Sequence, residues 1–309
     1  MSYEGKMLID LGMPSRKAVE EVLLKSLFKH DGTITEFAVG EEIVEEIADD
    51  FRLNTQQRNA YLETVYRLEN RVKRSRLWHR LLFRAADALA KEKLVSRPTQ
   101  TALLTHTREW MLTEDGYDRA LKLLDIPRYQ KDTLRIKSYE VQKIVKELNE
   151  RSRPNNYNPF EMGKKITKVT KDIKLRNRGF RQATIEAYEC KCAVCGLKIS
   201  SPDGTQWEVE AAHIVPHGLN GRDDILNGLA LCRLHHWAFD VGWFTLEDNY
   251  SVLPSKRIGA LPADFGKTGS YDCFRNLVSV VGTIILPKNM AMYPHQNSIR
   301  WHRDHVFAR

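Results

Sequence analysis

The sequence has no long apolar run. Its longest one, LVSVVGTIILP near residue 280, is too short to cross a bilayer, which takes about 20 apolar residues. The N-terminus, MSYEGKMLIDLG, has charged residues between its apolar ones and lacks the apolar core of a signal peptide. We therefore expect a cytoplasmic protein without a membrane partner. At 309 residues, 42% hydrophobic and 28% charged, the chain has a globular composition and the length for two domains.

Cysteines are few, and their number is odd. Five of them in a chain expected to be cytoplasmic do not indicate a disulfide framework. Their spacing indicates a metal site instead, because two residues separate Cys192 from Cys195, and two separate Cys232 from His235. Two such pairs can close a tetrahedral structural zinc site. Cys190 is an alternative to Cys192, because the run CKCAVC offers two registers.

Positive charge is in excess and unevenly spread. The net charge is +8, from 48 Lys and Arg against 40 Asp and Glu. Basic side chains concentrate in residues 71–93 and 164–181, whereas residues 41–50 are rich in acidic ones. Basic patches set apart from an acidic face are typical of proteins that bind nucleic acid. The alternative is that each run is only the solvated face of a helix.

The N-terminal half has the pattern of several helices followed by two short strands. Helical spacing covers residues 15–30, with Ser15 as the cap, then about 36–50, a start near Thr55, and about 76–93. The runs LVSRP and REWMLT are strand-like and joined by a polar connection, and EDGYDRALKLL predicts another helix. Helices followed by a hairpin predict a winged helix, a DNA-binding variant of helix-turn-helix.

This part of the sequence also resembles winged-helix modules of bacterial restriction proteins, from AKEKL through VSRP to WMLTEDG. In such a module the helix at about residues 76–93 would be the recognition helix. Its candidate DNA-binding side chains are Arg76, His79, Arg80 and Arg84. The apolar residues expected to face inward are Leu81, Leu82, Ala85 and Leu89. Two alternatives are a packed helix with arginines extending from it and a module that binds protein.

A change of composition separates the two expected domains. The segment RSRPNNYNPF, residues 151–160, combines two prolines with three asparagines, which is typical of a linker. We therefore expect a mainly helical, winged-helix-like DNA-recognition domain at 1–150, a linker at 151–163 and a second domain at 164–309. The fold class is α+β.

The densest group of histidines lies in the stretch AAHIVPHGLNGRDDILNGLALCRLHH, residues 211–236. WEVEAAHIV predicts a strand that ends at His213, prolines and glycines predict a loop, and RLHHWAFDVG predicts a short helix. A unit this small buries little apolar area, so zinc at the two Cys/His pairs would supply folding free energy. Because histidine transfers protons and binds metals near neutral pH, the stretch also predicts a functional site.

These motifs together resemble an HNH endonuclease of the ββα-metal superfamily, over about residues 180–245. The matching residues are His213, Asn227 and His236, on the background of the four zinc ligands. The later runs FDVGWFTL and RWHRDHVF resemble the bacterial, restriction-associated branch of the family. The resemblance implies a zinc-stabilised nuclease domain, phosphodiester hydrolysis, and Mg²⁺ or Mn²⁺ as the catalytic ion.

The chemistry of hydrolysis suggests a role for each residue, because it needs an activated water and stabilisation of the charge that develops. His213, at a strand end, suits the general base, and His236 suits a ligand of the divalent ion. Asn227 suits either a loop clamp that orients His213 or a second ligand of that ion. Asp240 lies one helical turn after His236 and suits a second-shell partner that orients it.

One position departs from the family pattern. Many HNH endonucleases have an aspartate, a second metal ligand, immediately before the first histidine, and this chain has Ala212 there. Asn227, Asp223 and Asp224 are the alternatives that would compensate, and the sequence does not choose among them.

We therefore expect a restriction-type endonuclease whose partner is double-stranded DNA. No methyltransferase features are visible, and an enzyme acting alone would spare its host by attacking only DNA with 5-methylcytosine or 5-hydroxymethylcytosine. The alternatives are a conventional sequence-specific restriction enzyme, a DNA-binding regulator with a purely structural zinc module, and an RNA- or structure-specific nuclease. One HNH site cuts one strand, so a double-strand break requires a homodimer or two successive events.

Overall fold

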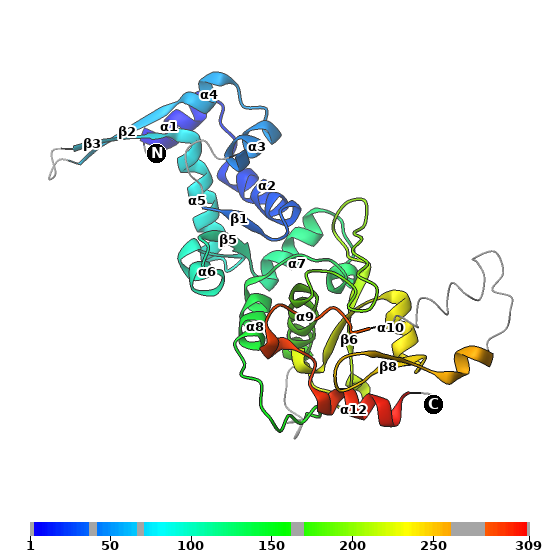
Figure 1. Cartoon of the computed structure of the whole chain (residues 1–309). Coiled ribbons are helices and arrows are strands. Elements are labelled where there is room, and N and C mark those ends of the chain that lie inside the picture. Colours follow the sequence, from blue (N-terminus) through cyan, green and yellow to red (C-terminus); the bar gives the residue numbers. More distant parts are fainter. Residues whose placement is uncertain (1–2, 37–41, 67–70, 162–169, 261–281, 308–309) are drawn as a thin grey trace. The chain divides into compact units, whose positions relative to one another are not determined.

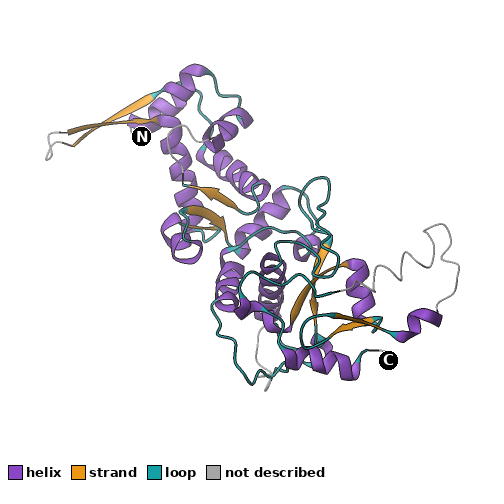
Figure 2. Ribbon diagram, viewed as in Figure 1, coloured by secondary structure: helices purple, strands orange, loops and turns teal. Residues whose placement is uncertain are grey.

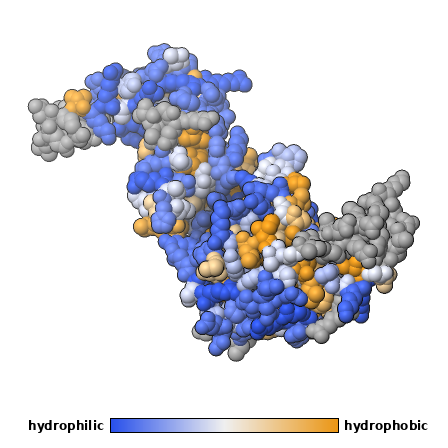
Figure 3. Space-filling view, in the orientation of Figure 1, coloured by the Kyte–Doolittle hydropathy of each residue, from blue (hydrophilic) through white to orange (hydrophobic). Residues whose placement is uncertain are grey.

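The chain divides into two compact units, Met1–Gln142 and Lys143–Arg309 (Figure 1). The computed structural model describes residues 3–36, 42–66, 71–161, 170–260 and 282–307. Both units mix helices with short strands, as expected for the α+β class (Figure 2). No helix in the described ranges is long and apolar enough to cross a membrane. The face drawn in Figure 3 is largely hydrophilic, with smaller apolar patches.

The first unit is mainly helical. Its helices are α1 (Tyr3–Asp10), α2 (Arg16–Lys29), α3 (Glu42–Asp50), α4 (Thr55–Asn59), α5 (Leu77–Lys91), α6 (Pro98–Thr105) and α7 (Glu114–Leu123). Its strands are β1 (Thr33–Thr35), β2 (Tyr61–Tyr66), β3 (Arg71–Arg76), β4 (Val95–Ser96) and β5 (Glu109–Leu112). A short 3-10 helix follows at Arg128–Asp132, and α8 (Tyr139–Asn149) spans the boundary between the units.

Helix α2 begins and ends at the residues that the sequence predicts. The Ser15 side chain accepts a hydrogen bond from the Ala18 amide at 3.2 Å, which satisfies one of the free donors of the first turn. After the helix, Asp31 and Gly32 have φ values of 56° and 91° and turn the chain. A Cβ atom at Gly32 would lie 2.1 Å from the Lys137 carbonyl oxygen, so only glycine suits this position.

Helix α5 packs its apolar face against α2. All four residues expected to face inward are buried: Leu81, Leu82, Ala85 and Leu89. Trp78 joins them, and its indole Nε1 donates a hydrogen bond to the Val44 carbonyl at 3.1 Å. The helix is therefore fixed to the core along one side.

Two small sheets complete the first unit. Strands β1, β5 and β4 form an antiparallel sheet in the order β1-β5-β4. The connection between β4 and β5, expected to be simply polar, contains helix α6. Strands β2 and β3 form a separate antiparallel hairpin, in register from Tyr61 opposite Arg76 to Tyr66 opposite Arg71. This hairpin, which was not predicted from the sequence, projects from the helices of its unit (Figure 1).

The second unit is built around a strand-strand-helix motif. Strands β6 (Val209–His213) and β7 (Gly228–Cys232) pair in antiparallel fashion, and α10 (Arg233–Asp240) follows directly. The predicted strand end at His213 and the predicted short helix are confirmed. The other described elements are α9 (Thr170–Ala187), β8 (Phe244–Leu246), β9 (Val252–Pro254), α12 (Gln296–His305) and four 3-10 turns (His217–Leu219, Ile225–Asn227, Lys256–Ala260 and Met290–Met292). Helix α9 packs against both β6 and β7.

Part of the expected linker, 151–163, makes contacts within the second unit. Arg151 forms an ion pair with Asp224 at 2.9 Å. The Pro154 carbonyl accepts a hydrogen bond from the His295 Nε2 at 3.1 Å, and Phe160 forms a backbone bridge with Gly221. The remainder of that linker, from residue 162, lies outside the described residues. The compact second unit accordingly begins at Lys143, ahead of the segment with linker composition.

Candidate active site and metal centre

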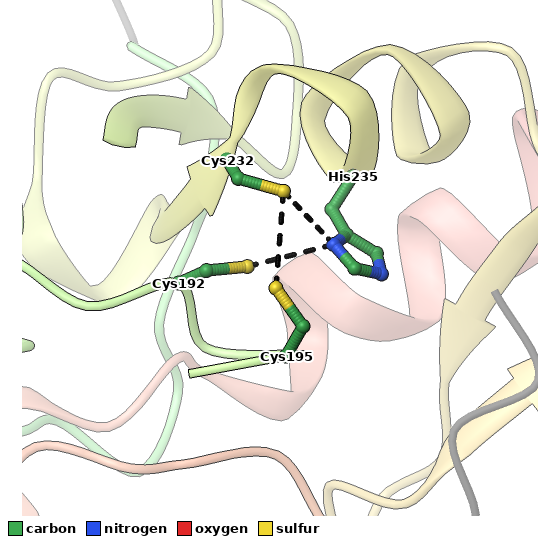
Figure 4. A group of neighbouring side chains, drawn as sticks. All are labelled: Cys192, Cys195, Cys232 and His235. Atoms are coloured by element: carbon green, nitrogen blue, oxygen red, sulfur yellow. Dashed lines mark hydrogen bonds between the residues drawn. The ribbon is translucent and has the colours of Figure 1, made fainter. Parts of the chain in front are cut away.

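Three cysteines and one histidine converge on a common point in the second unit (Figure 4). Their ligand atoms all lie within 4.8 Å of one another, and the group consists of Cys192, Cys195, Cys232 and His235. The two sulfurs of Cys195 and Cys232 are 3.9 Å apart, and the Cys192 sulfur is 3.6 Å from His235 Nδ1. Zn–S bonds of about 2.3 Å in a tetrahedron place sulfurs about 3.8 Å apart. The cluster therefore has the size of a structural zinc site.

The same four residues are those that the sequence pairs as zinc ligands. Cys192 and Cys232 are buried, as is His235, and Cys190 is not part of the cluster. Hydrogen bonds from the thiols of Cys195 and then Cys232 hold the pKa of the Cys192 thiol well below its ordinary value. The hydrogen bonds with Cys192 and then Cys195 raise the pKa of the Cys232 thiol, so among these coupled thiols the thiolate is favoured at Cys192, and a bound Zn²⁺ would hold the other sulfurs as thiolates. Within the part of the chain that the structure describes, no other group of three or more Cys, His, Asp or Glu residues gathers in this way.

His213, at the end of β6, is held from several sides. Its Nε2 lies 2.9 Å from Asp223 Oδ1, and the imidazole stacks on the Phe180 ring of α9, with centroids 4.1 Å apart. Gly228 is the β7 residue opposite His213. A Cβ atom there would come within 2.9 Å of the Phe180 ring, and within 2.8 Å of Thr184 Oγ1. The glycine therefore makes room for the ring that supports His213.

Asn227 clamps the loop between β6 and β7. Its side chain is fully buried, and its Oδ1 accepts a hydrogen bond from the Val215 amide at 2.9 Å. Its Nδ2 donates to the carbonyl oxygens of Val215 and Arg222, each at 3.1 Å. The backbone carbonyl of Asn227 also accepts from the Ile214 amide at 2.9 Å. This geometry favours the loop-clamp alternative, because the amide oxygen already has a partner.

His236 lies between two carboxylates. Its Nδ1 is 3.0 Å from Glu210 Oε2 of β6, and its Nε2 is 3.5 Å from Asp240 Oδ2, one turn further along α10. Burial lowers the pKa of His236, but the hydrogen bond to Glu210 and the negative charges of Asp240 and Glu210 outweigh it, so the net pKa is raised. The same hydrogen bond lowers the pKa of Glu210. Burial raises the pKa of Asp240.

The residues considered as substitutes for the aspartate of the family pattern do not lie beside His236. Ala212 is fully buried in the apolar core, so its position on β6 faces away from a solvent-accessible site. Asp223 contacts His213, and the Asn227 amide holds the loop. Asp224 is buried, accepting a hydrogen bond from the Leu226 amide at 3.1 Å besides its ion pair with Arg151. The carboxylates beside His236 are instead those of Glu210 and Asp240.

Sequence reasoning missed Glu210 and Arg181. Glu210 is 26 residues before its partner His236, and only the packing of α10 beside β6 brings the two together. The positive charge of Arg181, on α9, adds a smaller effect: it contributes to the lowered pKa of Glu210 and partly opposes the rise in the pKa of His236, so this guanidinium acts on the same site. One signal was available for Glu210, since a charged residue inside the apolar run WEVEAAHIV needs a buried partner or an exposed face.

The candidate DNA-binding side chains of α5 have partners within the first unit. Arg80 and Arg84 both form ion pairs with the buried carboxylate of Glu4, at 2.9 and 2.7 Å. The Arg76 guanidinium donates a hydrogen bond to the Tyr61 hydroxyl at 3.3 Å. His79 is partly buried, which lowers the pKa of its imidazole. The positive charge that α5 presents is thus smaller than its sequence indicates.

The model of an HNH endonuclease family matches residues 192–247. This segment contains the Cys/His cluster, His213, Asn227 and His236. The match confirms the resemblance to HNH endonucleases and supports a nuclease activity. A solved structure, described as a modification dependent TagI restriction endonuclease, is similar at 23% sequence identity and a TM-score of 0.29. The similarity covers 41% of this chain and 37% of that chain, little more than a third of its length. No curated protein matches the chain.

Proposed function

We propose that this chain is a restriction-type DNA endonuclease that hydrolyses phosphodiester bonds with a histidine general base and a divalent ion. The observation that carries the proposal is the arrangement of two histidines on one strand-strand-helix motif. His213 is paired with Asp223, and His236 lies between Glu210 and Asp240. The proposed substrate is double-stranded DNA carrying 5-methylcytosine or 5-hydroxymethylcytosine, by analogy with the restriction-associated proteins that the sequence resembles.

His213 has the surroundings of a general base. With Nε2 as the donor, the imidazole gives its proton-bearing side to the Asp223 carboxylate at 2.9 Å and keeps the Nδ1 lone pair to accept a proton from water. The Asp223 carboxylate stabilises the imidazolium that forms when His213 takes that proton. The stacked Phe180 ring and the Asn227 clamp restrict movement of the strand end, so the base keeps its orientation.

The residues around His236 suit a divalent ion. His236 Nε2 and Asp240 Oδ2 are 3.5 Å apart, somewhat more than the roughly 3.0 Å between adjacent ligands of an octahedral ion with bonds of about 2.1 Å, so a small side-chain rotation would let both reach one ion. Imidazole together with carboxylate oxygen suits Mn²⁺ and is acceptable to Mg²⁺. When bound, such an ion supplies charge stabilisation at the scissile phosphate and its leaving oxygen. In this assignment Glu210 fixes the His236 ring through Nδ1, and Asp240 is a ligand in place of Asn227.

We further propose that the first unit is a winged-helix DNA-recognition domain. Helix α2, strand β1, helix α3 and helix α5 are followed by β4 and β5, and the strands form the sheet β1-β5-β4. If α4, β2 and β3 (between α3 and α5) and α6 (between β4 and β5) are taken as insertions, this order is the one expected of a winged helix with α5 as the recognition helix. Arg76, His79, Arg80 and Arg84 are the proposed contacts.

The experiment that tests the proposal is cleavage of three matched DNA duplexes, which carry cytosine, 5-methylcytosine or 5-hydroxymethylcytosine, with Mg²⁺ or Mn²⁺. His213→Ala should abolish cleavage, by a factor of at least about 10² as expected for loss of a general base, while zinc content and DNA binding persist. His217→Ala is the control, because His217 lies nearby with ring centroids 5.8 Å from His213 and has no proposed role.

Each other outcome has a definite meaning. Cleavage of unmodified DNA at fixed sites would favour a conventional restriction enzyme. Binding without cleavage of any duplex would favour a DNA-binding regulator with a structural zinc module. Cleavage confined to single-stranded RNA would favour an RNA nuclease, and loss of zinc from the His213→Ala protein would contradict the assignment of His213 as the base.

A further inference from the structure

The β2–β3 hairpin is a basic element with no part in the proposed active site. Its twelve strand residues contain four basic ones, Arg71, Lys73, Arg74 and Arg76, against the single acidic Glu63. The two strands pair only with each other, and the hairpin projects from the helices (Figure 1). An isolated two-stranded hairpin is marginally stable in water. An exposed, basic element of this kind is therefore a candidate for binding a ligand.

One face of the hairpin displays arginines on an aromatic support. Tyr61 lies opposite Arg76 and Glu63 lies opposite Arg74, so these four side chains share a face. The Arg74 guanidinium lies 4.4 Å from the centre of the Tyr61 ring, and Arg76 donates to the Tyr61 hydroxyl. These contacts orient both guanidinium groups and reduce the entropy lost when they bind a ligand.

The charge on this face is not neutralised as it is on α5. Arg74 remains 66% exposed, and its nearest carboxylate, Glu63, is 3.9 Å away and 64% exposed. Lys73 is exposed on the opposite face of the strand. On α5, by contrast, both Arg80 and Arg84 are paired with a buried carboxylate. The hairpin is therefore the part of the first unit with the more available positive charge.

The exposed surface of the hairpin suits a polyanion better than a protein. Val72, which is 58% exposed, lies on the same face as Arg74 and Arg76, so the exposed aliphatic surface in the described part of this face is flanked by positive charge. A two-stranded antiparallel ribbon has the width to enter the major groove of B-DNA. Lysine and arginine on its strands would meet the phosphates on either side.

We propose that the β2–β3 hairpin is a second DNA-binding element of the first unit, which enters a groove of the duplex and contacts phosphates through Lys73 and Arg74. The proposal rests on the proposed function, since it requires a DNA substrate. The hairpin would supply affinity for the DNA backbone, whereas α5 would contact the bases. The hairpin directly precedes α5 in the chain, with Leu77 following Arg76, so one element positions the other.

The test measures binding of a DNA duplex to the full-length His213→Ala protein, which binds without cutting, over a range of salt concentrations. Lys73→Ala with Arg74→Ala should weaken binding roughly tenfold or more and reduce the slope of log K against log salt by about 1.8, or about 0.9 per lost phosphate contact. Lys17→Ala with Lys29→Ala is the matched control, because it removes two exposed charges of α2 in the same unit. Its binding should stay close to that of the parent.

Further comparisons separate failure of the hairpin proposal from failure of the proposed function. The exchange Lys73→Arg with Arg74→Lys keeps both charges and should retain parental binding, so a folding defect of the alanine variant is separated from loss of charge. If Lys73→Ala with Arg74→Ala binds DNA as tightly as Lys17→Ala with Lys29→Ala, the hairpin is not a DNA-binding element. Cleavage of DNA by the wild-type protein would still support the proposed nuclease function. Absence of both binding and cleavage of DNA by the wild-type protein would overturn the two proposals together.

Discussion

The two units hold their side chains in place by different means. The first has a continuous apolar core, drawn chiefly from α2, α3, α5 and α7, in which residues such as Leu23 and Leu82 are fully buried. The second has a core that includes Cys192 and Cys232, two members of the Cys/His cluster. The first fold therefore depends on apolar periodicity, whereas a metal bound at that cluster would add to the stability of the second, whose strands and helix are short.

The largest expected effect is removal of the zinc site. Cys232→Ser, or prolonged chelation of the metal, should unfold the β6–β7–α10 motif and abolish cleavage, because structural zinc binding supplies about 10 kcal/mol or more of folding free energy in small domains. The first unit should keep its own unfolding transition. Circular dichroism, metal analysis and limited proteolysis measure these properties. Cys190→Ser is the control, since Cys190 lies outside the cluster and its variant should keep zinc.

A smaller effect is expected from a cavity in the first unit. Leu82 is fully buried, so Leu82→Ala should lower the free energy of unfolding of that unit by about 2 to 5 kcal/mol. Zinc content and the transition of the second unit should not change. Denaturant titration measures the difference, with Phe83→Ala as the control because the neighbouring Phe83 is 40% exposed. Release of zinc by Leu82→Ala would show that the two units are not independent.

The smallest expected effect depends on pH and belongs to the second unit. Burial lowers the pKa of His302 to about 4, and its Nε2 donates to the Phe239 carbonyl at 3.0 Å. Because the folded pKa lies below the ordinary value of 6.5, the stabilisation is present above pH 6.5 and is lost as the pH falls towards 4. Between pH 7 and pH 5 the loss should be about 2 kcal/mol.

Unfolding of the second unit at several pH values measures this loss. His302→Gln replaces the imidazole with an amide that donates and accepts hydrogen bonds but does not take up a proton. The stability of this variant should therefore depend less on pH over this range. A variant with the same pH dependence as the wild-type protein would assign the effect to other groups, such as the cysteine ligands of zinc.

Much of the second unit could be predicted from the sequence. The spacing of the ligand residues identified Cys192, Cys195, Cys232 and His235, because a tetrahedral metal site favours pairs of ligands two residues apart in the sequence. Strand β6 was equally predictable up to His213, because β-branched and aromatic residues precede a proline- and glycine-rich loop. These signals are local, and each depends only on neighbours in the sequence.

The parts that the sequence did not indicate depend on distant packing. Glu210 meets His236 because a helix lies over a strand, and Arg80 meets Glu4 across 76 residues. The β2–β3 hairpin was missed because its basic residues adjoin the helical pattern of α5, and charge alone does not distinguish a strand from a helix face. Spacing in the sequence therefore identified the Cys/His cluster and Asp240, one turn after His236, but not Glu210.

His235 and His236 are consecutive residues at the start of α10, yet the first belongs to the metal cluster and the second lies between the carboxylates. A single helical step of about 100° separates their directions. One short helix thus serves two groups of side chains. A distortion of α10 that draws His235 out of the cluster would also displace His236 from Glu210, so damage at one group is expected to reach the other.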